Sequence, residues 1–311
     1  MKVNCIINPI AGDGKACRAW FRLLAPLSAH FPALEYDFTK HKGHATQLAK
    51  EAVAKQADLV IAFGGDGTFH EIVNGLAYSK TALAIVPTGS GNDFARSLKL
   101  PATLTSLADV IIAGNHQTID LGIVNGRYFL NMAGIGFDAE VAQRVHQRSL
   151  TGTAAYVSSI IETIFKYKPL EVEIDIDGTL TREKITMVAV GNGRYVGGGV
   201  FMLPKADITD GLLDVCLISE TTKGDMIKTL PATYFGKHLD HPKCRYLKLK
   251  EITIRPVDSE HPAYAQLDGE GYNEFPLRFK IAPQALKLVV PGNPAVRHQE
   301  HAENNETASN Y

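Results

Sequence analysis

The chain has 311 residues, of which 45% are hydrophobic and 21% charged, a composition typical of a globular protein with a buried core and enough chain for two domains. Its 32 lysines and arginines against 33 aspartates and glutamates give a net charge of −1, which excludes a whole-chain field that attracts nucleic acid or anionic membrane. We therefore expect no nucleic-acid partner.

The first third of the chain alternates short apolar runs with amphipathic helical stretches. We predict strands at 3–7, 34–38, 58–63 and 82–86, and helices at 15–29, 44–56 and 68–78. This βαβα order predicts a parallel sheet with helices on both faces. Ligands of such sheets bind beyond the carboxyl ends of the strands, so we expect the glycine-rich loops that follow three of these strands to share one edge.

From about Asp120 the pattern changes to hairpins. Two tight-turn sequences, Asn125-Gly126 and Asp177-Gly178, join predicted strands at 120–124, 127–133, 170–176 and 179–191. Further strands are predicted at 212–218, 247–255, 263–268, 275–281 and 285–290, and helices at 137–147 and 152–167. We therefore predict a Rossmann-like α/β domain at 1–119, a mostly antiparallel β-sandwich domain at 120–291 and a disordered tail at 292–311.

The most informative turn is Gly64-Gly65-Asp66-Gly67-Thr68, between an apolar strand and a helix. Its three glycines let backbone N–H groups point at an anion, and the helix N-terminus adds partial positive charge, so we expect a bound phosphate. Asp66 would repel phosphate unless a divalent cation lies between them or the carboxylate accepts a proton. The alternative is a tight turn with Thr68 as the helix N-cap.

A second glycine loop, residues 87–93, follows the next predicted strand. Gly89 and Gly91 permit close backbone approach, Ser90 offers a hydroxyl, and Asn92 or Asp93 can cap the following helix. Capping alone would explain this loop, but two glycine loops at neighbouring strand ends indicate one bound polyphosphate. The sequence has no GxxxxGK[ST] motif, which disfavours a P-loop NTPase.

Two acidic clusters lie in the predicted β domain. Asp207 and Asp210 precede a glycine turn that suits either a hard cation or an ordinary solvated turn. Asp268 and Glu270 flank a glycine, so this segment is either a plain hairpin turn or the site of a general base that deprotonates a hydroxyl.

The cysteines, the apolar runs and a basic stretch bear on where in the cell the protein acts. The four cysteines are far apart and form no CxxC pair, so we expect neither a zinc site nor a disulfide framework. The sequence has no signal-peptide core and no run of ~18 apolar residues, so we expect a cytoplasmic protein without a transmembrane segment. A basic stretch is interpreted as a solvated face or as a contact with anionic lipid; it contains Lys237, Lys243, Arg245, Lys248 and Lys250.

Taken together, the motifs resemble the diacylglycerol kinase catalytic family, most closely its soluble bacterial lipid kinases, which are relatives of sphingosine and ceramide kinases. The resemblance is carried by Asn8-Pro9, Gly64 to Thr68, Gly89 to Ala95, Gly134 to Asp138, Asp210 to Asp214 and Leu267 to Glu270. It implies a first domain that binds ATP with magnesium and a β-sandwich domain whose cleft with the first accepts a lipid headgroup.

The resemblance also implies roles for individual residues. Nucleotide binding falls to Asn8, Thr39, Gly64, Gly65, Asp66, Gly67, Thr68, Phe69, His70, Ser90 and Asn92. Glu270 matches the general base, with Asp268 beside it and Asp66 as a further catalytic residue. The backbone oxygens of Asp207 and Leu212, with the Asp210 carboxylate, resemble a structural magnesium site. His70 stands where the family often has Asn, which puts one nucleotide contact in question.

The predicted function is transfer of the γ-phosphoryl group of ATP to a lipid hydroxyl, with diacylglycerol or a related lipid as acceptor at a membrane surface. One alternative is a kinase similar to NAD kinase, because the GGDG motif is shared with that family. Another is a nucleotide-sensing regulatory protein without turnover, which the presence of Asp66 and Glu270 disfavours. The sequence leaves the acceptor lipid and the oligomeric state open, and a homodimer is one alternative.

Overall fold

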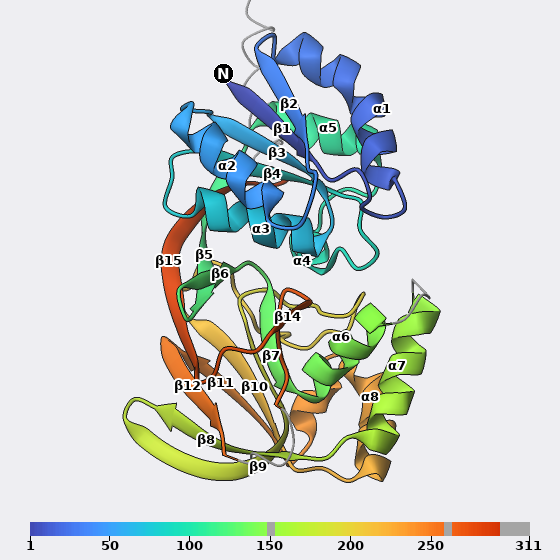
Figure 1. Cartoon of the computed structure of the whole chain (residues 1–311), viewed down its shortest axis with the longest axis vertical. Coiled ribbons are helices and arrows are strands. Elements are labelled where there is room, and N and C mark those ends of the chain that lie inside the picture. Colours follow the sequence, from blue (N-terminus) through green and yellow to red (C-terminus); the bar gives the residue numbers. More distant parts are fainter. Residues whose placement is uncertain (148–152, 258–262, 293–311) are drawn as a thin grey trace, which may run out of the picture.

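The computed structural model describes residues 1–147, 153–257 and 263–292. Figure 1 shows two halves, an α/β half that begins at the N-terminus and a second half built mainly from antiparallel strands. The predicted disordered tail lies outside the described residues from position 293 onward.

The first half follows the predicted alternation of strands and helices. Its parallel strands lie in the order β2-β1-β3-β4, with bounds β1 (Val3–Ile7), β2 (Leu34–Phe38), β3 (Leu59–Gly64) and β4 (Ala82–Pro87). Its helices are α1 (Lys15–His30), α2 (His44–Ala54), α3 (Asp66–Leu76), α4 (Asp93–Ser97) and α5 (Leu104–Ala113). Helix α4 follows the second glycine loop as expected, with Asn92 at the N-cap position but without a side-chain capping hydrogen bond, whereas helix α5 was not predicted. Helix α3 begins at Asp66 with Gly65 as N-cap, so Thr68 lies in its first turn and is not the cap.

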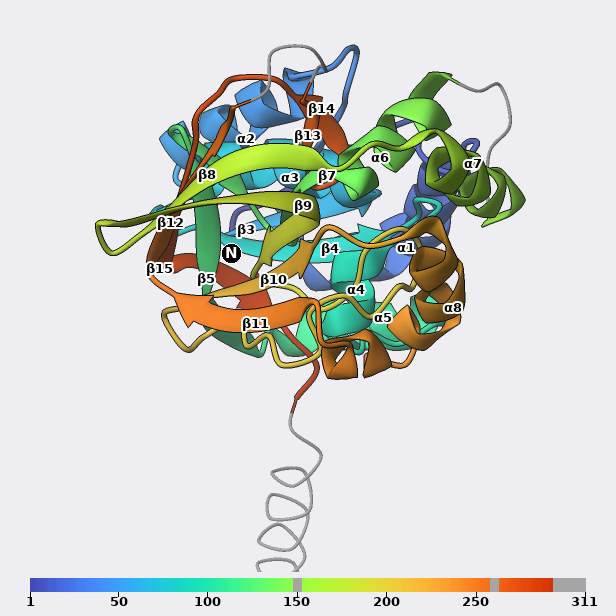
Figure 2. The same cartoon turned by 90° about the horizontal axis from the view of Figure 1, so that it is seen from below.

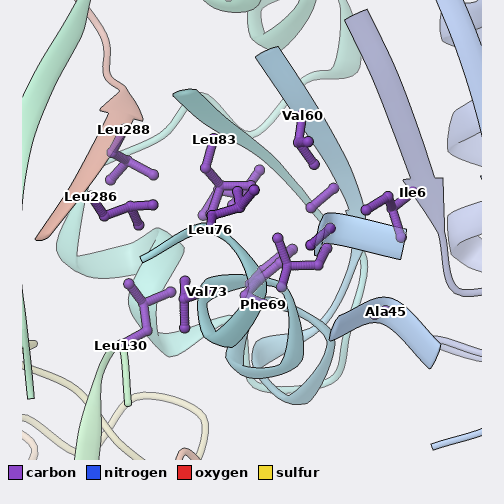
Figure 3. Packing of buried hydrophobic residues seen from close by; sticks show 14 of the residues in the cluster. Ile6, Ala45, Val60, Phe69, Val73, Leu76, Leu83, Leu130, Leu286 and Leu288 are labelled. Carbon is purple, nitrogen blue, oxygen red and sulfur yellow. The ribbon is translucent and has the colours of Figure 1, made fainter. Parts of the chain in front are cut away.

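Both faces of this sheet are buried. Ile6 packs in a cluster with α2 and α3, while its neighbour Ile7 packs in a cluster with α1 and α5. Consecutive side chains of a strand point to opposite faces, so strands covered on both sides consist of near-continuous apolar runs. Figure 3 shows Phe69 of α3 within the first cluster, which also contains Leu83 from β4 and Leu286 from the last strand of the chain.

The second half consists of antiparallel strands with helices at one side (Figures 1 and 2). Its strands are β6 (Arg127–Phe129), β7 (Met132–Gly136), β8 (Leu170–Ile176), β9 (Thr179–Gly191), β10 (Leu213–Ser219), β11 (Cys244–Leu249), β12 (Glu251–Pro256), β13 (Ala265–Leu267) and β14 (Glu270–Tyr272). Its helices are α6 (Phe137–Gln147), α7 (Thr153–Lys166), α8 (Lys223–Thr233) and the 3₁₀ helix η1 (Lys237–Asp240).

Several elements of this half differ from the predicted ones. The predicted strand 127–133 is divided into β6 and β7, which pair with β5 (His116–Val124) and with β9 and β13 respectively. The predicted strand 247–255 is likewise divided, because β11 pairs with β10 whereas β12 pairs with β8 and with the last strand, β15 (Leu277–Val289). Helix α8 was not predicted. Each division occurs where the chain changes from one partner strand to another. Local periodicity in the sequence carries no information about the partner strand.

The last strand, β15 (Leu277–Val289), joins the two halves and replaces the two strands predicted at 275–281 and 285–290. Its first part pairs with β12, and its end pairs in parallel with β4, while β5 runs antiparallel beside both parts. The strand changes register between Ala282 and Leu286, and there the Asp120 carboxylate accepts the N–H of Gln284 at 2.7 Å. The first half of the fold therefore includes the C-terminal strand (Figure 1).

Candidate active site

Three loops meet at the carboxyl edge of the parallel sheet. The Asn8 side chain, directly after β1, donates a hydrogen bond to the Thr68 hydroxyl at 2.9 Å. A Cβ added to Gly89 would lie 2.6 Å from the Cα of Gly65, and one added to Gly12, whose φ is +57°, would lie 1.9 Å from a backbone oxygen of Thr88. These glycines are required because the three backbones pack directly against one another.

A pocket opens at this edge and encloses about 1030 Å³ not filled by protein atoms, including space open to solvent. Predicted nucleotide residues among its lining residues are Asn8, Thr39, Gly65, Gly67 and Thr68. The first turn of a helix has N–H groups without intrahelical partners and a partial positive charge, so the start of α3 suits a phosphate group. We refer to this cavity as the nucleotide pocket.

The nucleotide pocket also has a cationic side that the sequence analysis missed. Lys40, His41 and Lys42, which follow β2, are among its lining residues. The sequence did contain a sign of this cationic side, because these basic residues lie just beyond the carboxyl end of a predicted parallel strand. Lys42 pairs with the Glu270 carboxylate, which comes from the other half of the chain. The pocket therefore combines backbone N–H groups with side-chain ammonium groups, both suited to a polyphosphate.

Glu270 lies where the nucleotide pocket meets a second pocket between the two halves. The second pocket includes His70 and Asn74 from α3 and Arg127 from the other half, and Glu270 lines both pockets. The Glu270 side chain is 33% exposed, and its Oε1 would lie 3.2 Å from a Cβ added to Gly67. The carboxylate is thus positioned between the glycine loop and the second pocket, where it can accept a proton from a hydroxyl group bound there.

Asp268, the other predicted catalytic carboxylate, is 1% exposed and fully engaged. It accepts hydrogen bonds from the backbone N–H groups of Leu130, Asn131 and Met132 at 2.8 to 2.9 Å, and it contacts His70 Nδ1 at 2.9 Å. These bonds hold the turn that carries Glu270, and a catalytic role for Asp268 stays a prediction. The His70 ring contacts Asp268 and lines the second pocket, and its predicted nucleotide contact is likewise untested.

The predicted nucleotide residues Phe69, Asn92, Gly64 and Ser90 are not among the residues that line the pocket. The Phe69 side chain is fully buried beneath the glycine loop, so it cannot contact a nucleotide. Asn92 exchanges two hydrogen bonds with the backbone of Gly89, at 2.9 and 2.8 Å, and thereby holds the second glycine loop. Gly64 is buried at the end of β3, and Ser90 is exposed beside Gly89.

Asp66 and Asp93 form a pair of largely buried carboxylates beside the nucleotide pocket. Asp66 accepts the N–H groups of Asp93 and Phe94 at 3.3 Å. Burial, together with the charge of Asp93, raises the pKa of Asp66 to about 6, and burial also raises the pKa of Asp93. The Oδ1 atom of Asp93 is buried without a hydrogen-bond partner among the described residues. The other carboxylate oxygen of Asp93 accepts the N–H of Gly198 at 2.9 Å, so Oδ1 is the atom of this pair for which the described residues supply no donor.

We expect the free energy of unfolding to fall as the pH rises from about 4 to about 6 in the absence of divalent cations. Because folding raises the pKa of Asp66 from 3.8 to about 6, the folded state binds this proton more tightly, and its advantage is lost once the carboxyl ionises. The contribution is at most about 3 kcal/mol. Urea unfolding at several pH values measures it. Asp66→Asn should weaken the pH dependence, whereas the exposed Asp109→Asn should leave it unchanged; equal slopes in all three proteins would contradict the assignment.

The predicted magnesium loop at Asp207 to Leu212 is engaged differently from the prediction. The Asp210 carboxylate accepts the Leu212 N–H at 3.0 Å and pairs with Lys248 at 2.6 Å, and Lys248 also reaches the buried Asp214. The Asp207 carboxylate accepts its hydrogen bonds from Thr209. In the described part of the chain no three His, Cys, Asp or Glu side chains gather as metal ligands. The Asp210 carboxylate is thus already paired with a lysine and the Asp207 carboxylate with Thr209, and the magnesium site stays a prediction.

Two of the five side chains of the predicted basic stretch pair with carboxylates within the fold. Arg245 pairs with Glu183, Lys248 pairs with Asp210, and Lys243 donates to the backbone oxygen of Glu220 at 2.6 Å. These contacts reduce the charge that the stretch can present to an anionic surface.

Comparison with known proteins decides the family. The profile described as diacylglycerol kinase catalytic domain matches residues 2–124, and the profile described as YegS C-terminal NAD kinase beta sandwich-like domain matches residues 131–290. The diacylglycerol kinase of Bacillus subtilis (strain 168) is 32% identical over 299 residues, covering 93% of this chain and 96% of its own. The chain belongs to the diacylglycerol kinase family.

Further relatives agree with this family of lipid kinases. The diacylglycerol kinase of Staphylococcus saprophyticus is 29% identical over 297 residues, covering 94% of this chain and 96% of its own. A crystal structure of a diacylglycerol kinase from Bacillus anthracis strain Sterne superimposes with a TM-score of 0.74 at 29% identity, covering 95% of this chain and 98% of that one. The predicted fold class, an α/β domain followed by a β-sandwich domain, is confirmed. None of the helices in the described ranges combines the length and apolar character needed to cross a bilayer.

Proposed function

We propose that this lipid kinase transfers the γ-phosphoryl group of ATP to the hydroxyl of diacylglycerol. The observation that carries the proposal is the position of Glu270, which lines both the nucleotide pocket and the second pocket between the two halves. A phosphoryl donor in the first and an acceptor hydroxyl in the second would meet at this carboxylate. The acceptor is inferred from the relatives, which are diacylglycerol kinases.

The contribution of the protein to this reaction is mainly positioning and charge neutralisation, because phosphoryl transfer needs little covalent chemistry from the enzyme. The N–H groups at the start of α3 would orient the β- and γ-phosphates, and Lys42 would stabilise their charge. Since Lys42 pairs with Glu270 in the structure, phosphate binding would draw this ammonium group away from the carboxylate. Glu270 would then accept the proton of the acceptor hydroxyl as it attacks the γ-phosphorus.

The family implies magnesium, and the carboxylates beside the nucleotide pocket fit it. The unpartnered Oδ1 of Asp93 and the raised pKa of Asp66 mark a place where a hard cation would find oxygen ligands. Magnesium bound there with ATP would neutralise charge on the β- and γ-phosphates. Asp66 is therefore proposed as a catalytic residue through its charge. The Asp210 loop remains the predicted site of a structural magnesium ion, although the Lys248 ammonium group already contacts its carboxylate.

The acceptor is tested with labelled ATP against a panel of substrates. Dioleoylglycerol, sphingosine and phosphatidylglycerol in mixed micelles are compared with NAD, each in the presence of magnesium. We expect phosphatidic acid from dioleoylglycerol as the main product. Efficient NAD phosphorylation without any labelled lipid would favour the alternative similar to NAD kinase, and nucleotide binding without turnover would favour a regulatory protein.

The cellular location and the oligomeric state of the protein also need to be tested. We propose that the protein acts in the cytoplasm and reaches its lipid by peripheral contact with the membrane surface. A homodimer stays a prediction, which light scattering of the purified protein would test.

A further inference from the structure

Two of the four cysteines meet in the second half of the chain. Cys216 lies on β10, and Cys244 is the first residue of β11, 28 positions later in the sequence. The two strands pair side by side (Figures 1 and 2), and the two sulfur atoms are 3.4 Å apart. Strand pairing thus brings together two thiols whose spacing along the chain did not indicate a contact.

The two thiols have unequal surroundings. Cys216 is fully buried in the same apolar cluster as Met132 and Met187, whereas Cys244 is only partly buried. A hydrogen bond in which the Cys216 S–H donates to the Cys244 sulfur favours the thiolate form of Cys244. It lowers the pKa of Cys244 and, together with burial, raises the pKa of Cys216. Since the thiolate is the reactive form of cysteine, Cys244 is the nucleophile of this pair.

The cysteines of the first half have different surroundings. Cys5 is fully buried on β1, and burial raises the pKa of its thiol well above the usual value. Cys17, on α1, is partly buried, and its sulfur contacts the backbone oxygen of Pro9 at 3.7 Å. Cysteines that sense oxidants are accessible, have a lowered pKa and lie next to a second cysteine that completes a disulfide. Cys244 meets all three conditions.

The strand geometry allows the two sulfur atoms to join. Cys216 lies opposite Tyr246 on β11. Cys244 lies two residues before Tyr246, so the two cysteines are diagonal neighbours whose side chains point to the same face. A disulfide bond is about 2.05 Å long, so the sulfur atoms must approach by roughly 1.4 Å from their present 3.4 Å. Because Cys244 begins its strand directly after a turn, a small movement of its backbone can supply this approach.

We propose that Cys216 and Cys244 form a disulfide when the protein meets hydrogen peroxide, which makes this pair an oxidation-sensitive site of the second half. The sulfur contact, the unequal burial of the two thiols and the strand pairing that holds them together support this site. The site is independent of the proposed kinase function. A small thiol can reverse the cross-link, because its thiolate attacks a disulfide sulfur.

The oxidation proceeds in two steps. The Cys244 thiolate first attacks one oxygen of hydrogen peroxide, so that an S–O bond forms, the O–O bond breaks and hydroxide leaves. The Cys216 sulfur then attacks the sulfenic sulfur of Cys244, so that an S–S bond forms, the S–O bond breaks and the hydroxyl group leaves with the Cys216 proton as water. The hydroxide of the first step takes up the proton that Cys244 lost on ionising. The two thiols thus lose two electrons and two protons, and one peroxide becomes two water molecules.

Thiol counting by mass spectrometry tests the site in the unchanged protein. The folded protein is treated with hydrogen peroxide, denatured and alkylated with N-ethylmaleimide, with and without prior reduction by dithiothreitol. We expect the number of alkylated thiols to fall from four to two and to return to four after reduction. Protease digestion should give one pair of peptides joined through Cys216 and Cys244. Four remaining thiols, a link to Cys5 or Cys17, or a link between two chains would overturn the proposal.

Single substitutions test the role of each thiol. Cys216→Ala should leave Cys244 as a sulfenic acid, which dimedone traps, and should form no disulfide. Cys244→Ala should leave Cys216 unoxidised, because a buried thiol without its partner is protected. The matched control is Cys17→Ser, which removes a partly buried thiol of the first half and should form the disulfide as the unchanged protein does. Oxidation of Cys216 in the Cys244→Ala variant, or loss of the disulfide in the control, would contradict these roles. Should Cys216→Ala fold poorly, the thiol count of the unchanged protein decides.

Discussion

Replacement of Glu270 by glutamine is expected to lower the maximum rate of lipid phosphorylation by roughly 10²- to 10⁴-fold. Glutamine retains the size of the side chain and its place beside Gly67 but cannot accept the proton of an attacking hydroxyl. Because the backbone N–H groups of the glycine loop are untouched, KM for ATP should change little. Steady-state kinetics with dioleoylglycerol in mixed micelles measures both quantities.

The matched control is Glu251→Gln, which removes an exposed carboxylate of the same kind on β12, where it pairs with Lys280. It should retain the activity of the unchanged protein. Should Glu270→Gln instead weaken ATP binding and spare the maximum rate, Glu270 would belong to the nucleotide pocket through its contact with Lys42. The role of general base would then have to be reassigned.

The second large effect is expected on stability, from Asp268→Asn. The Asp268 carboxylate accepts three backbone N–H groups and contacts His70. Asparagine retains the shape of the side chain, but its NH₂ group would face backbone N–H donors that a carboxylate oxygen accepts in the structure. A buried donor left without an acceptor costs about 1 to 3 kcal/mol, out of the roughly 5–15 kcal/mol that stabilises a typical domain. Urea unfolding measures the loss.

Asp177→Asn is the matched control, because Asp177 also has a positive φ before a glycine in a tight turn, here between β8 and β9. It should change the free energy of unfolding by less than about 0.5 kcal/mol. If both variants unfolded at the same urea concentration as the unchanged protein, the hydrogen bonds of Asp268 would contribute nothing to stability. A stable Asp268→Asn protein with reduced activity would make this residue part of the chemistry, as the sequence analysis predicted.

The sequence by itself determined the features encoded in local periodicity and turn chemistry. The alternation of buried runs with amphipathic stretches predicted the parallel sheet, and the glycine loops after β3 and β4 predicted a phosphate pocket at its carboxyl edge. Most of the residues that line that pocket follow directly from strand ends, such as Asn8 after β1 and Thr39 after β2. The meeting of these loops at one edge is confirmed, because a parallel sheet places all of its carboxyl strand ends together. The phosphate itself stays a prediction.

Only the tertiary structure decided which distant segments meet and where each side chain points. Glu270 reaches Lys42 and Gly67 because the turn after β13 is held by Asp268 against the chain between β6 and β7, more than a hundred residues away in sequence. The return of β15 to β4 and the division of 247–255 into two strands likewise depend on which strands pair. Pairing between distant strands and the direction of a side chain such as Asp268 follow from packing of the whole chain, and short-range patterns carry no information about them.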